Sequence, residues 1–176
     1  MTIAFLDVQY LATGARAACV VAPAWSSPTP LVTQVVDIET VQDYEPGALY
    51  RRELPCLLRV LERLPAPPDV LVVDGYVWLL DESAPGLGAR LHDATGGRTP
   101  VVGIAKTAFR DALAAPTVAK VLRGDSARPL FVTAIGLDLD AAATCVRSMA
   151  GDHRMPLLLT AVDRLARSGA PSSADD

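Results

Sequence analysis

Three acidic residues stand where hydrophobic stretches of the sequence meet polar ones. Asp7 follows the apolar run that begins at Ile3, and Asp74 ends the apolar run 70–74. Glu53 lies between them, in a stretch whose hydrophobic residues have helical spacing. Because an unpaired charge is costly in apolar surroundings, we expect these three carboxylates to meet around something positive. A divalent metal ion is the usual partner of such a group.

Oxygen ligands with few histidines suit Mg²⁺, or alternatively Mn²⁺, better than Zn²⁺. Metal ions held in this way can activate a water molecule and stabilise charge on a phosphodiester. Each acid also has a simpler interpretation: Asp7 as a strand-end acid, Glu53 as the partner of an arginine, and Asp74–Gly75 as a turn. The three acids taken together, in this order, favour the metal site.

The first half of the chain must bring Asp7 and Glu53 together. Residues 3–10, 17–22 and 31–38 are predicted strands, and the short connections between them favour an antiparallel meander. A helix is predicted from Pro46–Gly47 to about Leu64, with Glu53 on its hydrophobic side. Pro55 is expected to kink or restart this helix.

The second half contains alternating strands and helices. Strands are predicted at 70–74, 101–105 and 130–135, and helices at 85–94, 140–149 and 156–167, with Asp138 or Asp140 capping the second of these helices. Continuous apolar strands indicate a sheet covered on both faces. The expected fold is α/β, with a mixed sheet in which the antiparallel meander is followed by parallel strands, and with helices on both faces. Residues 1–168 are expected to form one domain and residues 169–176 a disordered tail.

Composition limits the function further. The formal charge of −4 argues against strong non-specific binding to nucleic acid, although a local basic groove remains compatible with it, since arginine supplies 14 of the 16 basic residues. The three cysteines have neither metal-ligand nor disulfide spacing, which favours reduced thiols in the cytoplasm. We expect no membrane association, because residues 1–10 do not resemble a leader and no apolar run approaches about 20 residues. The sequence contains no long coiled segment, so it permits a monomer, but it leaves the oligomeric state open.

Four segments together resemble the endonuclease V family. They are Asp-Val-Gln-Tyr at 7–10, Tyr-x-Pro-Gly-x-Leu-x-x-Arg-Glu at 44–53, Asp-Gly at 74–75 and Pro-x-Val-Gly-Ile-Ala-Lys at 100–106. The resemblance runs in order from residue 3 to about residue 166. It implies a ribonuclease-H-like fold and metal-dependent hydrolysis of a DNA or RNA strand, 3′ to a deaminated purine such as inosine or deoxyinosine.

The same resemblance implies roles for individual residues of the predicted metal site. Asp7, Glu53 and Asp74 match the metal ligands of the family. Lys106 matches a lysine near the cleaved phosphate, where a point charge is useful. Asp163 matches a further residue close to the metal, although by itself it could be an ordinary helix acid beside Arg167.

The resemblance also implies residues that contact the substrate. Tyr44 with Pro46 matches a wedge inserted beside the damaged base, and Gly75 matches a glycine next to the base pocket. The chain departs from the family pattern at Val77, where a second glycine is usual, and at the acidic 81–82 pair, where His-Pro-Arg is usual. Two alternatives therefore stay open: the same chemistry on another nucleic-acid substrate, and a module that binds nucleic acid or a protein without cleaving.

Overall fold

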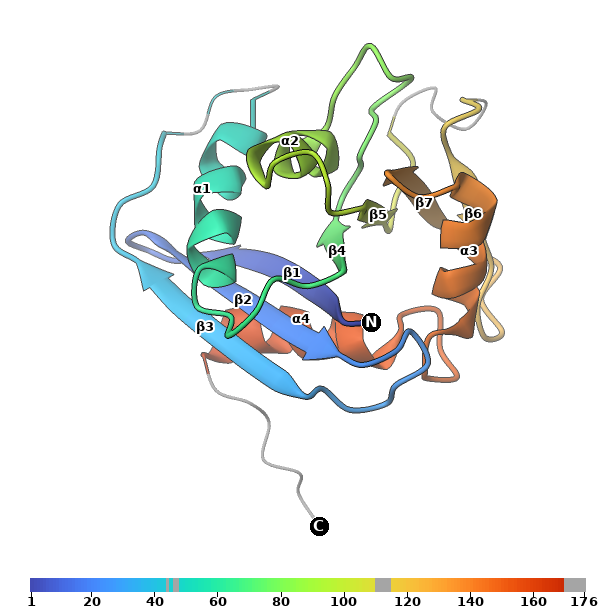
Figure 1. Cartoon of the computed structure of the whole chain (residues 1–176), viewed down its shortest axis with the longest axis horizontal. Coiled ribbons are helices and arrows are strands. Elements are labelled where there is room, and N and C mark those ends of the chain that lie inside the picture. The colour runs from blue at the N-terminus through green and yellow to red at the C-terminus, as the bar shows by residue number, and fades with distance from the viewer. Residues whose placement is uncertain (44, 46–47, 110–114, 170–176) are drawn as a thin grey trace.

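The strands form a single seven-stranded sheet in the order β3-β2-β1-β4-β5-β7-β6 (Figure 1). The computed structural model describes residues 1–43, 45, 48–109 and 115–169. Strands β1 (Ile3–Tyr10), β2 (Ala15–Ala22) and β3 (Val32–Ile38) pair antiparallel with their neighbours in sequence. This confirms the predicted meander, and it places β1 in the interior of the sheet.

The strands beyond β1 are partly parallel and partly antiparallel. Strands β4 (Val70–Asp74) and β5 (Val101–Ala105) run parallel to β1, as predicted. Strand β7 (Leu130–Ile135) returns antiparallel to β5, and the parallel part of the sheet therefore consists of three strands. The sequence pattern did not predict β6 (Ala119–Val121), because three residues with an exposed lysine at the centre carry almost no alternation.

Two helices cover each face of the sheet (Figure 1). Helices α1 (Tyr50–Leu61) and α2 (Leu87–Ala94) contact one face. Helices α3 (Leu139–Ser148) and α4 (Leu157–Ser168) contact the other. This confirms the predicted α/β layout. None of the helices in the described ranges has the length and hydrophobicity that crossing a bilayer requires.

Two details of the helices test expectations from the sequence. Asp138 caps α3, because its side chain accepts a hydrogen bond from the backbone N–H of Ala141 at 2.9 Å. The helix does not restart at Pro55, since α1 continues through it to Leu61. Pro55 lies in the second turn with its ring exposed, so its missing N–H removes only one bond, to the carbonyl of Arg51 near the helix start.

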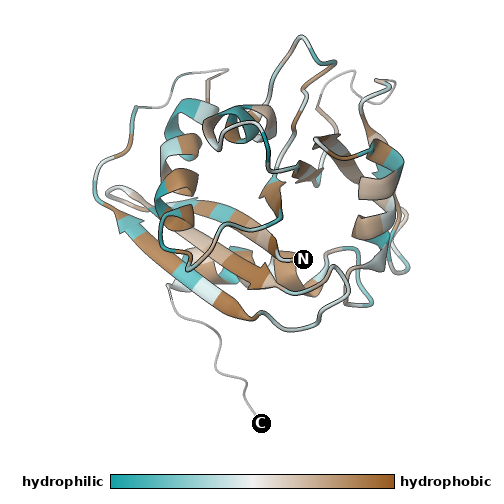
Figure 2. Ribbon diagram, in the orientation of Figure 1, coloured by the Kyte–Doolittle hydropathy of each residue, from teal (hydrophilic) through white to brown (hydrophobic). Residues whose placement is uncertain are grey.

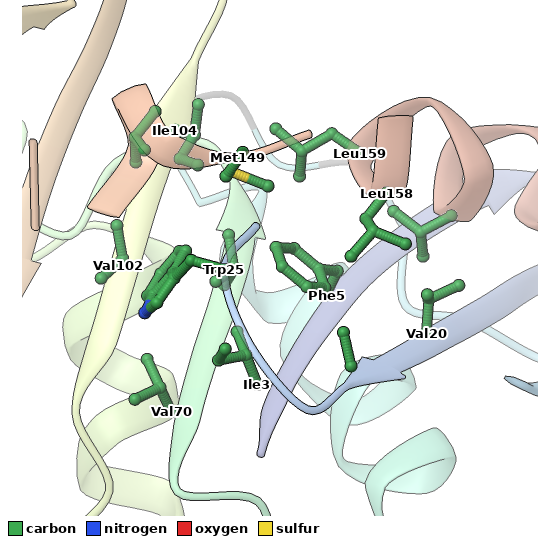
Figure 3. Packing of buried hydrophobic residues seen from close by; sticks show 14 of the residues in the cluster. Ile3, Phe5, Val20, Trp25, Val70, Val102, Ile104, Met149, Leu158 and Leu159 are labelled. Atoms are coloured by element: carbon green, nitrogen blue, oxygen red, sulfur yellow. The ribbon is translucent and has the colours of Figure 1, made fainter. Parts of the chain in front are cut away.

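The core consists of two large hydrophobic layers, one on each side of the sheet, and a small third cluster of Tyr76, Ala105 and Phe131. In the layer beneath α3 and α4, the ring of Phe5 meets the ring of Trp25 edge to face, with centroids 6.2 Å apart (Figure 3). The strands are coloured mostly as hydrophobic, whereas α1 shows both colours, as a helix that covers a sheet should (Figure 2). All three cysteines are free thiols, and Cys19 and Cys56 are buried.

Arg123 is an almost fully buried charge, with 7% of its surface exposed. Its guanidinium donates hydrogen bonds to backbone carbonyls between α3 and α4, those of Met149, Gly151, His153 and Arg154. One side chain thus ties the segment before α4 to the end of β6. The position of α4, and of any residue that it carries, depends on this anchor.

Arg123→Ala is expected to lower the free energy of unfolding by about 2–4 kcal/mol, because buried carbonyls lose charged donors and a cavity remains. Arg123→Lys should recover only part of this loss, since an ammonium cannot reproduce the forked geometry. Urea unfolding monitored by circular dichroism measures both changes. Arg128→Ala, at an exposed position, is the control. An equal loss in Arg128→Ala and Arg123→Ala would contradict the anchor.

Candidate active site

Asp7 and Asp74 lie side by side on adjacent parallel strands. Leu6 pairs with Val73 in the β1–β4 register, and each acid is the next residue along its strand. Neighbouring strands are about 4.8 Å apart. Both carboxylates line a small pocket together with residues of α4, among them Leu159 and Asp163. The sheet register itself therefore places two negative charges in close proximity.

Lys106 and Asp163 complete this pocket. Lys106 follows β5, two residues beyond Ile104, which is the partner of Asp74 in the sheet. Its Nζ lies 2.6 Å from Oδ2 of Asp74, and both side chains are about two-fifths exposed. Burial alone would lower the pKa of Lys106, but the hydrogen bond and charge of Asp74 raise it above the usual value. Asp163, on α4, accepts a hydrogen bond from Arg167 at 3.0 Å.

Glu53 reaches the same two aspartates from the opposite face of the sheet. A second pocket is lined by Glu53, Asp7 and Asp74, together with Leu57 of α1 and Leu87 of α2. The two pockets share both aspartates. The structure therefore brings together all three predicted metal ligands and Lys106, where β4 and β5 end beside the middle of β1.

The electrostatics of the cluster are unfavourable in isolation. Burial raises the pKa of Asp7 to about 6, although the hydrogen bond from the N–H of Val8 at 2.9 Å opposes this. Burial also raises the pKa of Glu53 to about 7, and the charges of Asp7 and Asp74 add to the effect. Shifts of this size at grouped carboxylates are characteristic of functional sites. The cluster is thus a place where added positive charge is stabilising.

The donor set fits a hard divalent cation, because it consists of carboxylate oxygens that repel one another. Nevertheless, within the described residues no three potential metal-ligating side chains are arranged to hold an ion as they stand. One carboxylate, Asp74, is engaged with the ammonium of Lys106 instead. Binding an ion through Asp74 would therefore compete with this ion pair, at a side chain that is partly exposed.

The segment after Asp74 is folded tightly against the sheet. Gly75 has a φ of +140°, which favours glycine, and the space where a Cβ would lie is open. Val77 is fully buried, and its backbone N–H donates to Oγ1 of Thr133 at 2.8 Å. The indole N–H of Trp78 donates to the carbonyl of Ala134 at 3.1 Å. The Val77 side chain thus occupies core space at the position where the family pattern has a glycine.

The remaining predicted site residues, Tyr44 and Pro46, lie outside the described residues. Sequence reasoning also missed residues that the fold brings to the site. Arg154 donates to the backbone carbonyls of Lys106 and Pro129, which fixes the start of the loop after β5. Arg52, next to Glu53, stacks on the ring of Tyr10 at 4.1 Å from its centroid. The only sequence signal for the latter contact was a pair of adjacent arginines at the start of a predicted helix.

Comparison of the sequence with known proteins finds one family along nearly the whole chain. The family model for endonuclease V matches residues 1–164. An endonuclease V of Streptomyces coelicolor is 44% identical over 66 residues, which cover 38% of this chain and 27% of that protein. One of Xanthomonas oryzae pv. oryzae is 37% identical over 87 residues, covering 49% and 35% respectively. The matched segments therefore span about a third of the curated relatives.

Solved structures agree with this result at the level of the fold. Endonuclease V from Streptomyces avermitilis superposes with a TM-score of 0.76 at 25% identity, covering 96% of this chain and 81% of that one. Human ENDOV gives a TM-score of 0.76 at 22% identity, with coverages of 96% and 83%. Ciona intestinalis endonuclease V, bound to a 23mer DNA containing an inosine followed by a ribo-adenosine, gives 0.78 at 18% identity, with coverages of 96% and 84%. The fold is thus ribonuclease-H-like, as expected, and the chain belongs to the endonuclease V family.

Proposed function

We propose that this chain is a metal-dependent endonuclease that hydrolyses a phosphodiester bond in a nucleic-acid strand. The observation that carries the proposal is the convergence of Asp7, Glu53 and Asp74 on two adjoining pockets. These three residues would hold one or two divalent cations, Mg²⁺ or Mn²⁺. Such a cation activates water and neutralises developing charge on the phosphate.

The other residues of the cluster have complementary roles in this proposal. Lys106 lies at the exposed edge of the pocket and contributes a positive charge to the scissile phosphate once Asp74 turns away from it. Asp163 lines the same pocket as Asp7 and assists the metal or the attacking water. Gly75 lets the backbone approach a base closely, because it carries no side chain into the open space beside it. Tyr44 and Pro46 remain the predicted wedge.

The first candidate substrate is a DNA or RNA strand that contains inosine, cleaved 3′ to that base. Membership of the family supports this candidate, as does the inosine-containing DNA bound to the Ciona protein. A second candidate is a nucleic acid without a deaminated base. This second candidate is favoured by the buried Val77, which stands where the family pattern has a glycine, and whose backbone N–H is bonded to Thr133. It is also favoured by the exposed Asp81 and Glu82, which provide no positive charge for a phosphate. We place either activity in the cytoplasm.

Labelled oligonucleotides that differ only in inosine or adenosine at one position test the proposal. We expect wild-type protein to cut the inosine strand near that base in the presence of Mg²⁺ or Mn²⁺, and a chelator to stop the reaction. Single- and double-stranded forms, in DNA and in RNA, define the substrate. Equal cutting of the inosine and adenosine strands would establish the second candidate. If no strand is cut under any condition, the proposal is wrong and the alternative of a non-cleaving binding module takes its place.

A further inference from the structure

Lys106 lies at the point where the strand pairing of β5 stops. Ala105, the last residue of β5, pairs with Phe131 of β7, and the chain then leaves the sheet. The ammonium of Lys106 nevertheless returns to Asp74 at the end of β4, 2.6 Å away. Backbone groups that leave a sheet beside the core need other hydrogen-bond partners. The location of the ammonium therefore depends on what holds residues 106–109.

The hydroxyl of Tyr76 makes two of the hydrogen bonds that hold this segment. It donates to the backbone carbonyl of Thr107 at 2.9 Å and accepts from the backbone N–H of Phe109 at 3.1 Å. Tyr76 is buried, with 8% of its surface exposed, and the centre of its ring lies 6.2 Å from that of Phe109. In the sequence it follows Asp74 by two residues. One phenol thus joins the segment after β4 to the segment that follows Lys106.

Arg154 holds the same segment from the side of α4. Its Nη2 donates to the backbone carbonyl of Lys106 and, at 2.9 Å, to that of Pro129, directly before β7. The next residue, Met155, lines the carboxylate pocket together with Lys106. The backbone carbonyl of Arg154 accepts a hydrogen bond from the buried Arg123. Arg154 thus ties Lys106 to the same anchor that holds the segment before α4.

The relative strength of these contacts indicates which of them determines the position of the ammonium. The side chains of Lys106 and Asp74 are each about two-fifths exposed, and such ion pairs contribute little because water screens them. Hydrogen bonds from a guanidinium to carbonyls are stronger, and a buried hydroxyl is costly to leave without a partner. A lysine side chain is a flexible stem that does not fix its own end. The hydrogen bonds to the backbone, rather than the ion pair, therefore keep the ammonium at the carboxylates.

We propose that Tyr76 and Arg154 are positioning residues for Lys106. They hold the carbonyls of residues 106 and 107, so that the ammonium stays beside the carboxylates and meets the phosphate of the bound strand. Neither side chain lines the two carboxylate pockets, and both act through the backbone. This inference rests on the proposed function, which gives Lys106 the phosphate as its partner.

Selective acylation tests the position of the ammonium without nucleic acid or metal. The sequence has two lysines, and Lys120 is exposed at the centre of β6, so it serves as an internal reference. With a lysine-reactive acetyl ester and mass spectrometry, Tyr76→Phe and Arg154→Met should each raise the labelling of Lys106 relative to Lys120 by about two- to fivefold, because the ammonium is released from its ion pair. Thr117→Val is the matched control and should leave the ratio unchanged, since its hydroxyl binds the carbonyl of Leu80 rather than residues 106–109.

Single-turnover cleavage of the strand that wild type cuts tests whether this position matters for the reaction. Tyr76→Phe is expected to lower the rate about tenfold, because small displacements of a catalytic group are costly. In a Lys106→Met background the same change should lower the rate by less than about twofold, since the group that it positions is already absent. Equal losses in the two backgrounds would mean that Tyr76 supports the fold in general, and would overturn the inference.

The outcomes separate this inference from the proposed function. If wild type cuts a strand and the labelling ratio stays unchanged in Tyr76→Phe and Arg154→Met, the positioning role is wrong and the endonuclease proposal stands. If wild type cuts no strand, the proposed function is wrong, and the labelling ratio alone decides whether the two residues hold Lys106. The labelling ratio also decides if Lys106→Met is too slow to measure. Circular dichroism checks folding, and Tyr76→Phe, which keeps its ring in the cluster with Ala105 and Phe131, remains informative if Arg154→Met unfolds.

Discussion

Asp74→Asn is expected to reduce metal-dependent strand cleavage by at least about a hundredfold while leaving the fold intact. Asp74 lines both pockets of the cluster and is the carboxylate bound to Lys106. Asparagine has nearly the same shape but no charge, so the cation loses an anionic ligand. The side chain is 39% exposed, and the amide can be hydrated, which is why stability should change little.

The measurement is the single-turnover cleavage rate at saturating Mg²⁺ or Mn²⁺, on whichever strand wild type cuts. Asp93→Asn is a matched control, because it removes an exposed carboxylate on α2 away from the cluster, and it should cleave at the wild-type rate. Retention of more than a tenth of the activity in Asp74→Asn would show that Asp74 is not a ligand.

Glu53→Gln and Asp7→Asn are each expected to stabilise the protein at pH 8 in the presence of a chelator. The pKa values of about 7 for Glu53 and about 6 for Asp7 lie above their ordinary values of 4.5 and 3.8. The folded state therefore binds protons more tightly than the unfolded state between about pH 4 and pH 7. The stability that this provides is fully present below pH 4 and is lost as the pH rises through 6 and 7. An amide at either position cannot ionise, so the variant does not lose that part of the stability as the pH rises.

One pH unit of pKa difference corresponds to about 1.4 kcal/mol, so each amide should add roughly 1–3 kcal/mol at pH 8 and little at pH 4.5. Urea unfolding at the two pH values, with and without Mg²⁺, measures the free energy of unfolding of each variant. Glu62→Gln, at an exposed position directly after the same helix, should change stability by less than about 0.5 kcal/mol. Mg²⁺ should stabilise wild type more than either variant. Amide variants that are less stable than wild type at pH 8 would show that the carboxylates support the fold.

The linear pattern of residues was sufficient to predict most of the frame of this site. Alternation and apolar runs identified the meander and strands β4 and β5, because buried strands leave a strong period in the sequence. An acid inside β1 and another at the end of β4 were expected to meet around a positive charge, and the parallel pairing of β1 with β4 places them side by side. Glu53 was predicted to face the core from its helical phase. These inferences depend on local periodicity, which a sequence displays directly.

The tertiary structure alone decided the contacts between distant residues. The backbone N–H of Val77 donates to Thr133, and Arg90 meets Tyr50 across two helices. Strand β6 exists because β7 offers it an edge, although its own three residues have little preference for a strand. Lys106 is bound to Asp74 because β5 pairs with β4 in one register. Such contacts depend on packing and register between segments that share no sequence period. The sequence by itself therefore determined which acidic residues form the site, whereas the tertiary structure decided which lysine and arginine side chains lie around them.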